Sequence, residues 1–272
     1  GQKRYIFHSA ERAISDAIER RGLKASPFLP KMMRQKELCL YQLKWDVALL
    51  EQNQVTIVIP TKDQVSLLRN CIDSLIKTTN RSFVKLVVVD DRSEEEETHQ
   101  YFRWLEKQRK IPCKVVAAPR GQGRFNYSRL INFGAGHVET PLFLQLNNDI
   151  QAIRRGWLED MVGWMSFENT GAVGAKLLYP DETIQHAGVW VGPHDGLADH
   201  QFHGLARDEV GYLALPHAAK NVSAVTGACL LTRTDLYREM NGFDEVNLEV
   251  EYNDVDYCLR LQEAGQKVVY SP

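Results

Sequence analysis

Three polar clusters each follow an apolar run, which is the pattern of side chains placed where buried strands end. Residues 61–63 (TKD) follow VTIVIP, residues 90–91 (DD) end KLVVVDD, and residues 147–149 (NND) follow PLFLQL. A divalent cation between two phosphates is typically held by one or two carboxylates together with phosphate oxygens and water. Asp149 is therefore a candidate metal ligand for a nucleoside diphosphate, and its alternative role is to cap the turn into the next helix.

The two adjacent carboxylates at 90–91 point to opposite sides of an extended chain, so at most one faces a ligand. Asp91 is expected to accept a hydrogen bond from a base N–H or a ribose hydroxyl. The alternative is that the pair begins a turn and caps the acidic helix that follows.

Asp254 stands in the first turn of a predicted helix that opens NDVDYCLR. The helix dipole favours its charged form there, and a carboxylate so placed can deprotonate a sugar hydroxyl. The alternative is simple charge complementarity at a helix end, which is the interpretation preferred for Asp256, four residues before Arg260.

Histidines provide a further set of candidates. His186, in IQHAG, could face a sugar at an acceptor site, although a histidine between two apolar strands is more often structural. One loop also contains side chains that could bind zinc, namely His194, Asp195, Asp199, His200 and His203. The favoured alternative is that these side chains are simply solvated in a polar loop.

The elements that would position these side chains alternate between strand and helix from Val55 onward. The periodicity predicts strands at 55–60, 85–91, 114–117 and 141–149, with helices at 67–76, 94–108 and 127–138 between them. Asp63 is expected to cap the first of these helices. In an open α/β sheet, ligands bind beyond the carboxyl ends of the strands, so the three polar clusters should converge on one crevice.

The second half is less regular. AVGAKLLY, AGVWVG, KVVY and the run NVSAVTGACLLTR at 221–233 each predict a strand, and 253–264 predicts a helix. Residues 1–53 are interpreted as an N-terminal accessory segment, partly irregular, with one amphipathic helix at 9–21 that Gly22 ends.

Composition narrows the classes of function. With 33 basic and 35 acidic residues, the net charge of −2 gives no electrostatic reason to bind nucleic acid. Five scattered cysteines, an odd number, indicate reduced thiols and a cytoplasmic location. No run approaches the roughly 18 apolar residues of a spanning helix, so a lipid substrate would imply peripheral association with the inner face of the cell membrane.

The chain from Val55 to Pro272 resembles the inverting family 2 glycosyltransferases, which have the GT-A fold. The matching motifs are VTIVIPTKD, KLVVVDDRS, NND before Ile150, VTGACLLTR and NDVDYCLR. FNYSRLIN, GAVGAKLLYPDETIQHAG and NGFDE resemble the rhamnosyltransferase-like subgroup that assembles bacterial O-antigen and other surface polysaccharides. Several ordered motifs in their expected strand-end context make chance similarity improbable.

This resemblance implies a Rossmann-like mixed α/β sheet over 54–272, with a nucleotide-binding half at about 54–150 and an acceptor-binding half at about 151–272. It implies an enzyme that uses Mg²⁺ or Mn²⁺ to move a sugar from a UDP- or dTDP-linked donor to a glycan or lipid-linked saccharide. The residue roles carried over are the metal ligand Asp149, the catalytic base Asp254 and a donor set of Pro60, Thr61, Asp63, Asp91, Asn126, Asn132 and Asn148.

Two departures from the family pattern leave alternatives open. Asn147 and Asn253 stand where many members have acidic residues, and the chain ends at Pro272, before a histidine that relatives often carry, so we expect a C-terminal truncation. These features favour, as the alternative, a non-catalytic nucleotide-binding or scaffold domain. A sugar-phosphate nucleotidyltransferase is disfavoured because PTKD lacks the Gly-rich phosphate loop.

Overall fold

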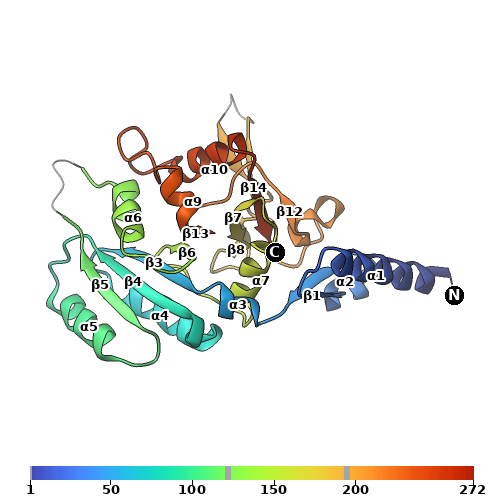
Figure 1. Ribbon diagram of the computed structural model, residues 1–272, viewed down its shortest axis with the longest axis horizontal. Coiled ribbons are helices and arrows are strands. Elements are labelled where there is room, and N and C mark those ends of the chain that lie inside the picture. Colours follow the sequence, from blue (N-terminus) through green and yellow to red (C-terminus); the bar gives the residue numbers. More distant parts are fainter. Residues whose placement is uncertain (1, 120–123, 193–196) are drawn as a thin grey trace.

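The computed structural model describes residues 2–119, 124–192 and 197–272 (Figure 1). Its centre is an eight-stranded mixed sheet in the order β12-β14-β7-β13-β6-β3-β4-β5. Its strands are β3 (Val55–Thr61), β4 (Val84–Asp90), β5 (Cys113–Ala117), β6 (Leu142–Leu146), β7 (Thr170–Ala175), β12 (Lys220–Asn221), β13 (Cys229–Arg233) and β14 (Lys267–Ser271).

The flanking helices are α3 (Leu49–Gln52), α4 (Val65–Thr78), α5 (Glu96–Lys107), α6 (Tyr127–Ala135), α7 (Trp157–Trp164), α9 (Thr234–Glu239) and α10 (Asn253–Glu263). Short strands outside the sheet are β8 (Leu177–Leu178), β9 (Ile184–His186), β10 (Val189–Val191) and β11 (Ala198–His200). Two 3₁₀ helices, Arg81–Phe83 and Tyr212–His217, complete this part.

Strand direction brings the polar clusters to one edge of the sheet. β3 is parallel to β4 and to β6, so Thr61 pairs with Asp90 at their carboxyl ends. β13 runs antiparallel to β6, with Cys229 opposite Leu146. The residues that precede β13 therefore lie beside those that follow β6, and the crevice expected from the sequence collects side chains from both halves of the chain.

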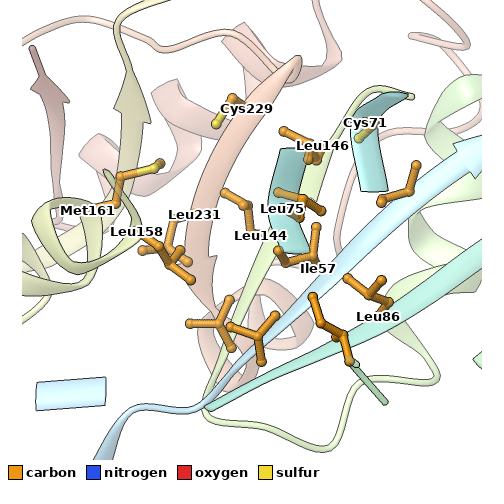
Figure 2. Packing of buried hydrophobic residues seen from close by; sticks show 14 of the residues in the cluster. Ile57, Cys71, Leu75, Leu86, Leu144, Leu146, Leu158, Met161, Cys229 and Leu231 are labelled. Carbon is orange, nitrogen blue, oxygen red and sulfur yellow. The ribbon is translucent and has the colours of Figure 1, made fainter. Parts of the chain in front are cut away.

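One face of the sheet is covered by α3, α4, α5 and α7. Side chains alternate along each strand, so Ile57 and Ile59 of β3 face this side while Val58 faces the other. Figure 2 shows Leu144 and Leu146 of β6 beside Leu231 and Cys229 of β13. Burial of each such leucine contributes about 1.5–3 kcal/mol, which fixes the strand ends that carry the polar clusters.

The opposite face is covered by α6, α9 and α10, whose buried residues include Leu130, Tyr237 and Tyr257. Gly134 lets α6 approach the sheet closely, since a Cβ there would lie 2.5 Å from Val58 Cγ1 and 2.7 Å from Val89 Cγ2. This close packing sets the height of the N-terminus of α6 above the sheet edge.

The N-terminal segment lies to one side of the sheet (Figure 1). It contains α1 (Gln2–Arg20), α2 (Lys31–Gln35) and a hairpin of β1 (Ala25–Phe28) with β2 (Gln42–Trp45). Trp45 is 4% exposed and packs edge-on against Trp164, in space that the missing side chain of Gly163 leaves open. The segment is thus joined to the main core through α7. Helix α1 begins at Gln2, earlier than the start predicted at residue 9.

Two sequence expectations about elements are wrong. The run 221–233 is not one strand, because residues 222–228, with a turn at 227–228, separate β12, which pairs with β14, from β13. Asp63 does not cap α4, since the N-cap residue is Gln64 and no side chain accepts a hydrogen bond there. Among the described residues, no helix is long and apolar enough to cross a membrane.

Candidate active site

Two cavities open along the polar edge of the sheet. The first, here the β3–β6 cavity, has a volume of about 400 Å³ and is lined by Pro60, Thr61, Lys62, Gln64, Leu67, Asp91, Phe125, Tyr127, Leu130, Asn147, Asn148 and Asp149. The second, here the α10 cavity, has a volume of about 520 Å³, and its lining includes His200, Gly227, Tyr252 and Asp254. Tyr127 and Asn147 line both cavities, so the two are neighbours.

The predicted residues at the ends of β3 and β6 are brought together as expected. Asn148 Nδ2 donates to Thr61 Oγ1 at 3.0 Å, which ties the two strand ends. Asp149 is exposed, and its carboxylate forms no hydrogen bond or ion pair with any residue that the structure describes. Asp149 is therefore an unpaired charge at the rim of the β3–β6 cavity.

The side chains around Asp149 suit a cation that arrives with phosphates. Asn147 Oδ1 already accepts from Tyr127 at 2.6 Å, whereas the single hydrogen bond of Asn148 uses its Nδ2 and leaves its Oδ1 available. No group of three His, Cys, Asp or Glu side chains that could hold a metal occurs within the described ranges. One carboxylate with an amide oxygen fits Mg²⁺ or Mn²⁺ only where phosphate oxygens complete the coordination.

Asp91 lines the β3–β6 cavity and is 5% exposed. Its Oδ1 accepts from Arg92 Nε at 3.1 Å, while its backbone N–H donates to the Thr61 carbonyl. The adjacent Asp90 turns away and accepts from the Ser93 amide at 2.8 Å, as expected for the turn-forming member of the pair. Asp91 is therefore the carboxylate that faces the cavity.

Asp63 has a different environment from the one predicted. Its Oδ1 accepts from the amides of Glu94 and Glu95 at 2.8 and 2.9 Å, and its own N–H donates to Ser93 Oγ at 2.8 Å. These contacts fasten the loop after β3 to the start of α5. Asp63 does not line the β3–β6 cavity.

Asn126 and Asn132 fasten α6 to the chain before α10. Asn126 caps α6 by accepting from the Arg129 amide at 2.8 Å, and its Nδ2 donates to the Glu245 carbonyl at 2.7 Å. Asn132 Oδ1 accepts from Tyr237 Oη at 2.6 Å and from the Phe243 amide at 2.9 Å. Neither asparagine lines either cavity, so their hydrogen bonds serve the position of α6.

Asp254 lines the α10 cavity, held by backbone amides. Its Oδ2 accepts from the Gly227 N–H at 2.6 Å and its Oδ1 from the Val255 N–H at 2.8 Å. Burial raises the pKa of Asp254 above its ordinary value of 3.8, and the two amides and His200 oppose that rise. A carboxylate with a raised pKa and a fixed orientation is suited to general-base chemistry.

A hydrogen-bond network not predicted from the sequence joins the two cavities. Tyr127 Oη donates to Asn147 Oδ1, and Gln145 Nε2 donates to Tyr127 Oη at 3.1 Å and to the Gly227 carbonyl at 2.5 Å. Burial, with added effects from Asp254 and Asp149, raises the pKa of Tyr127, so its hydroxyl stays protonated. The one sequence signal was Gln145, a polar residue inside an apolar strand.

The predicted histidines separate into different environments. His186 is 0% exposed and does not line the α10 cavity, whereas His200 does. His203 Nε2 lies 3.0 Å from Tyr179 Oη. His194 and Asp195 lie outside the described residues. The described members of the loop thus form no zinc site.

Comparisons with known proteins agree with this geometry. Residues 56–210 match the family described as Glycosyl transferase family 2. The O-antigen biosynthesis protein RfbC of Myxococcus xanthus is 32% identical over 262 residues, which cover 95% of this chain and 19% of that protein. The chain spans 23% and 19% of the lengths of two curated relatives and 41% of the length of a third.

Solved structures share the fold. GalNAc-T7 with UDP, GalNAc and Mn²⁺ superposes with a TM-score of 0.66 at 15% identity, over 85% of this chain and 44% of that one. The mannosyltransferase PcManGT of Pyrobaculum calidifontis, with GDP-Man and Mn²⁺, gives a TM-score of 0.58 at 16% identity, over 100% and 64%. The sheet order and these likenesses confirm the predicted GT-A fold, and the match over more than half of the 272 residues shows that the chain belongs to glycosyl transferase family 2.

Proposed function

We propose that the chain moves a sugar from a nucleoside-diphosphate sugar to a hydroxyl of a glycan or lipid-linked saccharide, with inversion at the anomeric carbon, during synthesis of a bacterial surface polysaccharide. The observation that carries this proposal is the pair of neighbouring cavities, one with Asp149 at its rim and the other with Asp254. The name of the Myxococcus relative supports the polysaccharide assignment.

The β3–β6 cavity is the proposed donor site. Asp91 would accept a hydrogen bond from the base or ribose, with Pro60 and Thr61 beside it, and Asn148 would face the diphosphate. Asp149 would hold a divalent cation, Mg²⁺ or Mn²⁺, which when bound neutralises charge on the departing diphosphate. The nucleotides in the two similar structures support a nucleotide-sugar donor, and we propose UDP or dTDP as its nucleotide.

The α10 cavity is the proposed acceptor site, where Asp254 acts as the base. The acceptor hydroxyl would give its proton to Asp254 as its oxygen bonds to the anomeric carbon and the bond to the diphosphate breaks. A single displacement of this kind inverts the configuration, and the Gly227 amide keeps the carboxylate oriented throughout.

We further propose that this reaction takes place in the cytoplasm, at the inner face of the membrane through peripheral contact. The cysteines, which are all free thiols, support a reducing compartment.

Measuring nucleotide release and sugar transfer with UDP- and dTDP-linked donors, with Mn²⁺ or Mg²⁺, tests the proposal. Asp254→Asn should keep nucleotide affinity and lose at least about 100-fold in transfer, because proton removal by a positioned base contributes about that factor or more. Asp149→Ala should lose the metal-dependent part of nucleotide binding. Transfer by Asp254→Asn at the wild-type rate would refute its role as base.

Asp256→Asn is the matched control, since Asp256 lies on the same helix but pairs with Arg260 at 2.8 Å outside the cavity. It should retain transfer. A wild-type protein that binds nucleotide but shows neither donor hydrolysis nor transfer would instead identify the scaffold alternative.

A further inference from the structure

Two histidines meet at the α10 cavity, which Asp254 also lines. His186 ends β9 and is fully buried, and His200 ends β11, where it pairs with Val189 and lines the cavity. Their Nδ1 atoms are 3.0 Å apart and their rings meet edge-on. A distance of that length between two ring nitrogens requires that one carries a proton and the other does not.

The backbone determines which nitrogen carries it. The Gly188 N–H points at His186 Nε2, 3.3 Å away, so this nitrogen must accept. Burial, together with His200 and Lys220, lowers the pKa of His186 well below 6.5, so the ring is neutral. A neutral His186 that accepts at Nε2 carries its single proton on Nδ1 and donates it to His200 Nδ1.

His200 is therefore restricted to one tautomer. Its Nδ1 accepts, so its proton lies on Nε2, and a second proton on Nδ1 would face the Nδ1–H of His186. Burial lowers the pKa of His200, with His203 acting in the same sense and with Asp254 and Asp199 opposing. No hydrogen bond engages His200 Nε2 among the residues that the structure describes. A neutral N–H donor is thus available on a residue that lines the cavity beside Asp254.

We propose that His186 holds His200 in the Nε2–H form, and that this N–H donates a hydrogen bond to the acceptor hydroxyl oxygen whose proton passes to Asp254. The inference rests on the proposed function. His200 gives up no proton in the reaction, since it only orients the oxygen lone pairs while the O–H bond points at the carboxylate. His200 is an acceptor-binding residue, and His186 is a positioning residue that acts through it.

The tautomer can be measured without any substrate. Long-range ¹H–¹⁵N NMR on ¹⁵N-histidine-labelled protein should show His200 as the neutral Nε2–H form from about pH 8 to about pH 6, a range over which a free histidine would protonate. In His186→Leu, His200 should become a mixture of tautomers that titrates. In His186→Asn, an amide N–H close to the former Nδ1 position should restore the single tautomer. A wild-type His200 that titrates normally or carries its proton on Nδ1 would overturn the inference.

Turnover tests the role in acceptor binding. His200→Leu should lower kcat/KM for the acceptor about 10-fold, the equivalent of one hydrogen bond, while nucleotide affinity stays unchanged because His200 does not line the β3–β6 cavity. His186→Leu should show part of that loss, and His186→Asn should recover most of it. His203→Leu is the control, because His203 contacts Tyr179 and does not line the cavity.

The results of these experiments distinguish failure of this inference from failure of the proposed function. If the wild type transfers sugar and His200→Leu does so with an unchanged kcat/KM for the acceptor, the inference alone is overturned. If His200→Leu also weakens nucleotide affinity, the residue serves the fold or the donor, and the inference also fails. A wild type with the fixed tautomer but no transfer would contradict the proposed function itself, and with it the acceptor role of His200.

Discussion

Gly227 is the position at which a single methyl group should separate acceptor chemistry from donor binding. Its N–H holds Asp254 and its carbonyl accepts from Gln145 Nε2. A Cβ built there collides with Gln145 Nε2 and lies 3.4 Å from Asp254 Cβ and 3.5 Å from its Oδ2. Gly227→Ala must therefore displace Gln145, and the displaced side chain or the turn itself must shift against Asp254.

The cost of that change can be worked from these contacts. Overpacking costs about 1–3 kcal/mol and the lost hydrogen bond of a buried amide about 1–3 kcal/mol, against a gain of up to about 1 kcal/mol from replacing glycine. A net loss of about 1–6 kcal/mol corresponds to a Tm lower by roughly 2–4 °C for each kcal/mol in a chain of this size. A carboxylate misplaced by about 1 Å can lower kcat about 100-fold.

Thermal unfolding, nucleotide binding and sugar transfer by Gly227→Ala would check this reasoning, with binding expected to stay near the wild-type value. Gly136→Ala is a suitable control: Gly136 has a helical φ of −62° at the end of α6, and a Cβ would lie 3.2 Å from the Phe133 carbonyl oxygen. It should change stability by less than about 1 kcal/mol. A Gly227→Ala protein with wild-type Tm and wild-type kcat would refute the importance assigned to this turn.

Three further predictions concern the carboxylates of Asp254 and Asp63. Asp254 must be ionised to accept a proton, and burial raises its pKa above the ordinary 3.8. We therefore expect kcat/KM for the acceptor to fall as the pH decreases through that raised pKa. A pH–rate profile with an acid limb at or below 3.8 would contradict the buried-base assignment. The same shift means that ionisation of Asp254 weakens the fold, so the stability of Asp254→Asn relative to the wild type should decrease as the pH is lowered through that pKa. Asp63→Ala should destabilise the protein by about 1–2 kcal/mol in denaturant unfolding, through loss of the two amide contacts at the start of α5, with Asp63→Asn losing less. Weakened nucleotide binding by an Asp63→Ala protein of unchanged stability would instead assign Asp63 to the donor site.

Local patterns predicted the parts of the fold that depend on neighbours in sequence. The apolar runs before Thr61, Asp90 and Asn147 form strands β3, β4 and β6 because continuous β-branched and aliphatic residues suit a strand buried on both faces. The parallel arrangement then placed their ends together, as expected. For that reason, the β3–β6 cavity is lined by Asp91, Asn148 and Asp149.

The rest depends on contacts between distant parts of the chain. Asn126 and Asn132 looked like ligand-binding amides, but their side-chain N–H groups donate to residues more than 100 positions later. His200 could not be distinguished from the other histidines of its loop, since its partner His186 is defined only when β9 and β11 come close. The turn at Gly227 was hidden inside what looked like one continuous strand.

The insertion of β13 between β6 and β7 determines when the site can form during folding. The Ala228 carbonyl accepts a hydrogen bond from the amide of Asn147, so this lining residue of the β3–β6 cavity is held by chain that follows some 80 residues later. During synthesis on the ribosome, a nascent chain that ends before β13 would carry an exposed edge on β6 and an unfinished crevice. We therefore expect the two parts of the sheet domain, residues 54–150 and 151–272, to fold as one cooperative unit, so that separately expressed parts should each fail to form a native sheet.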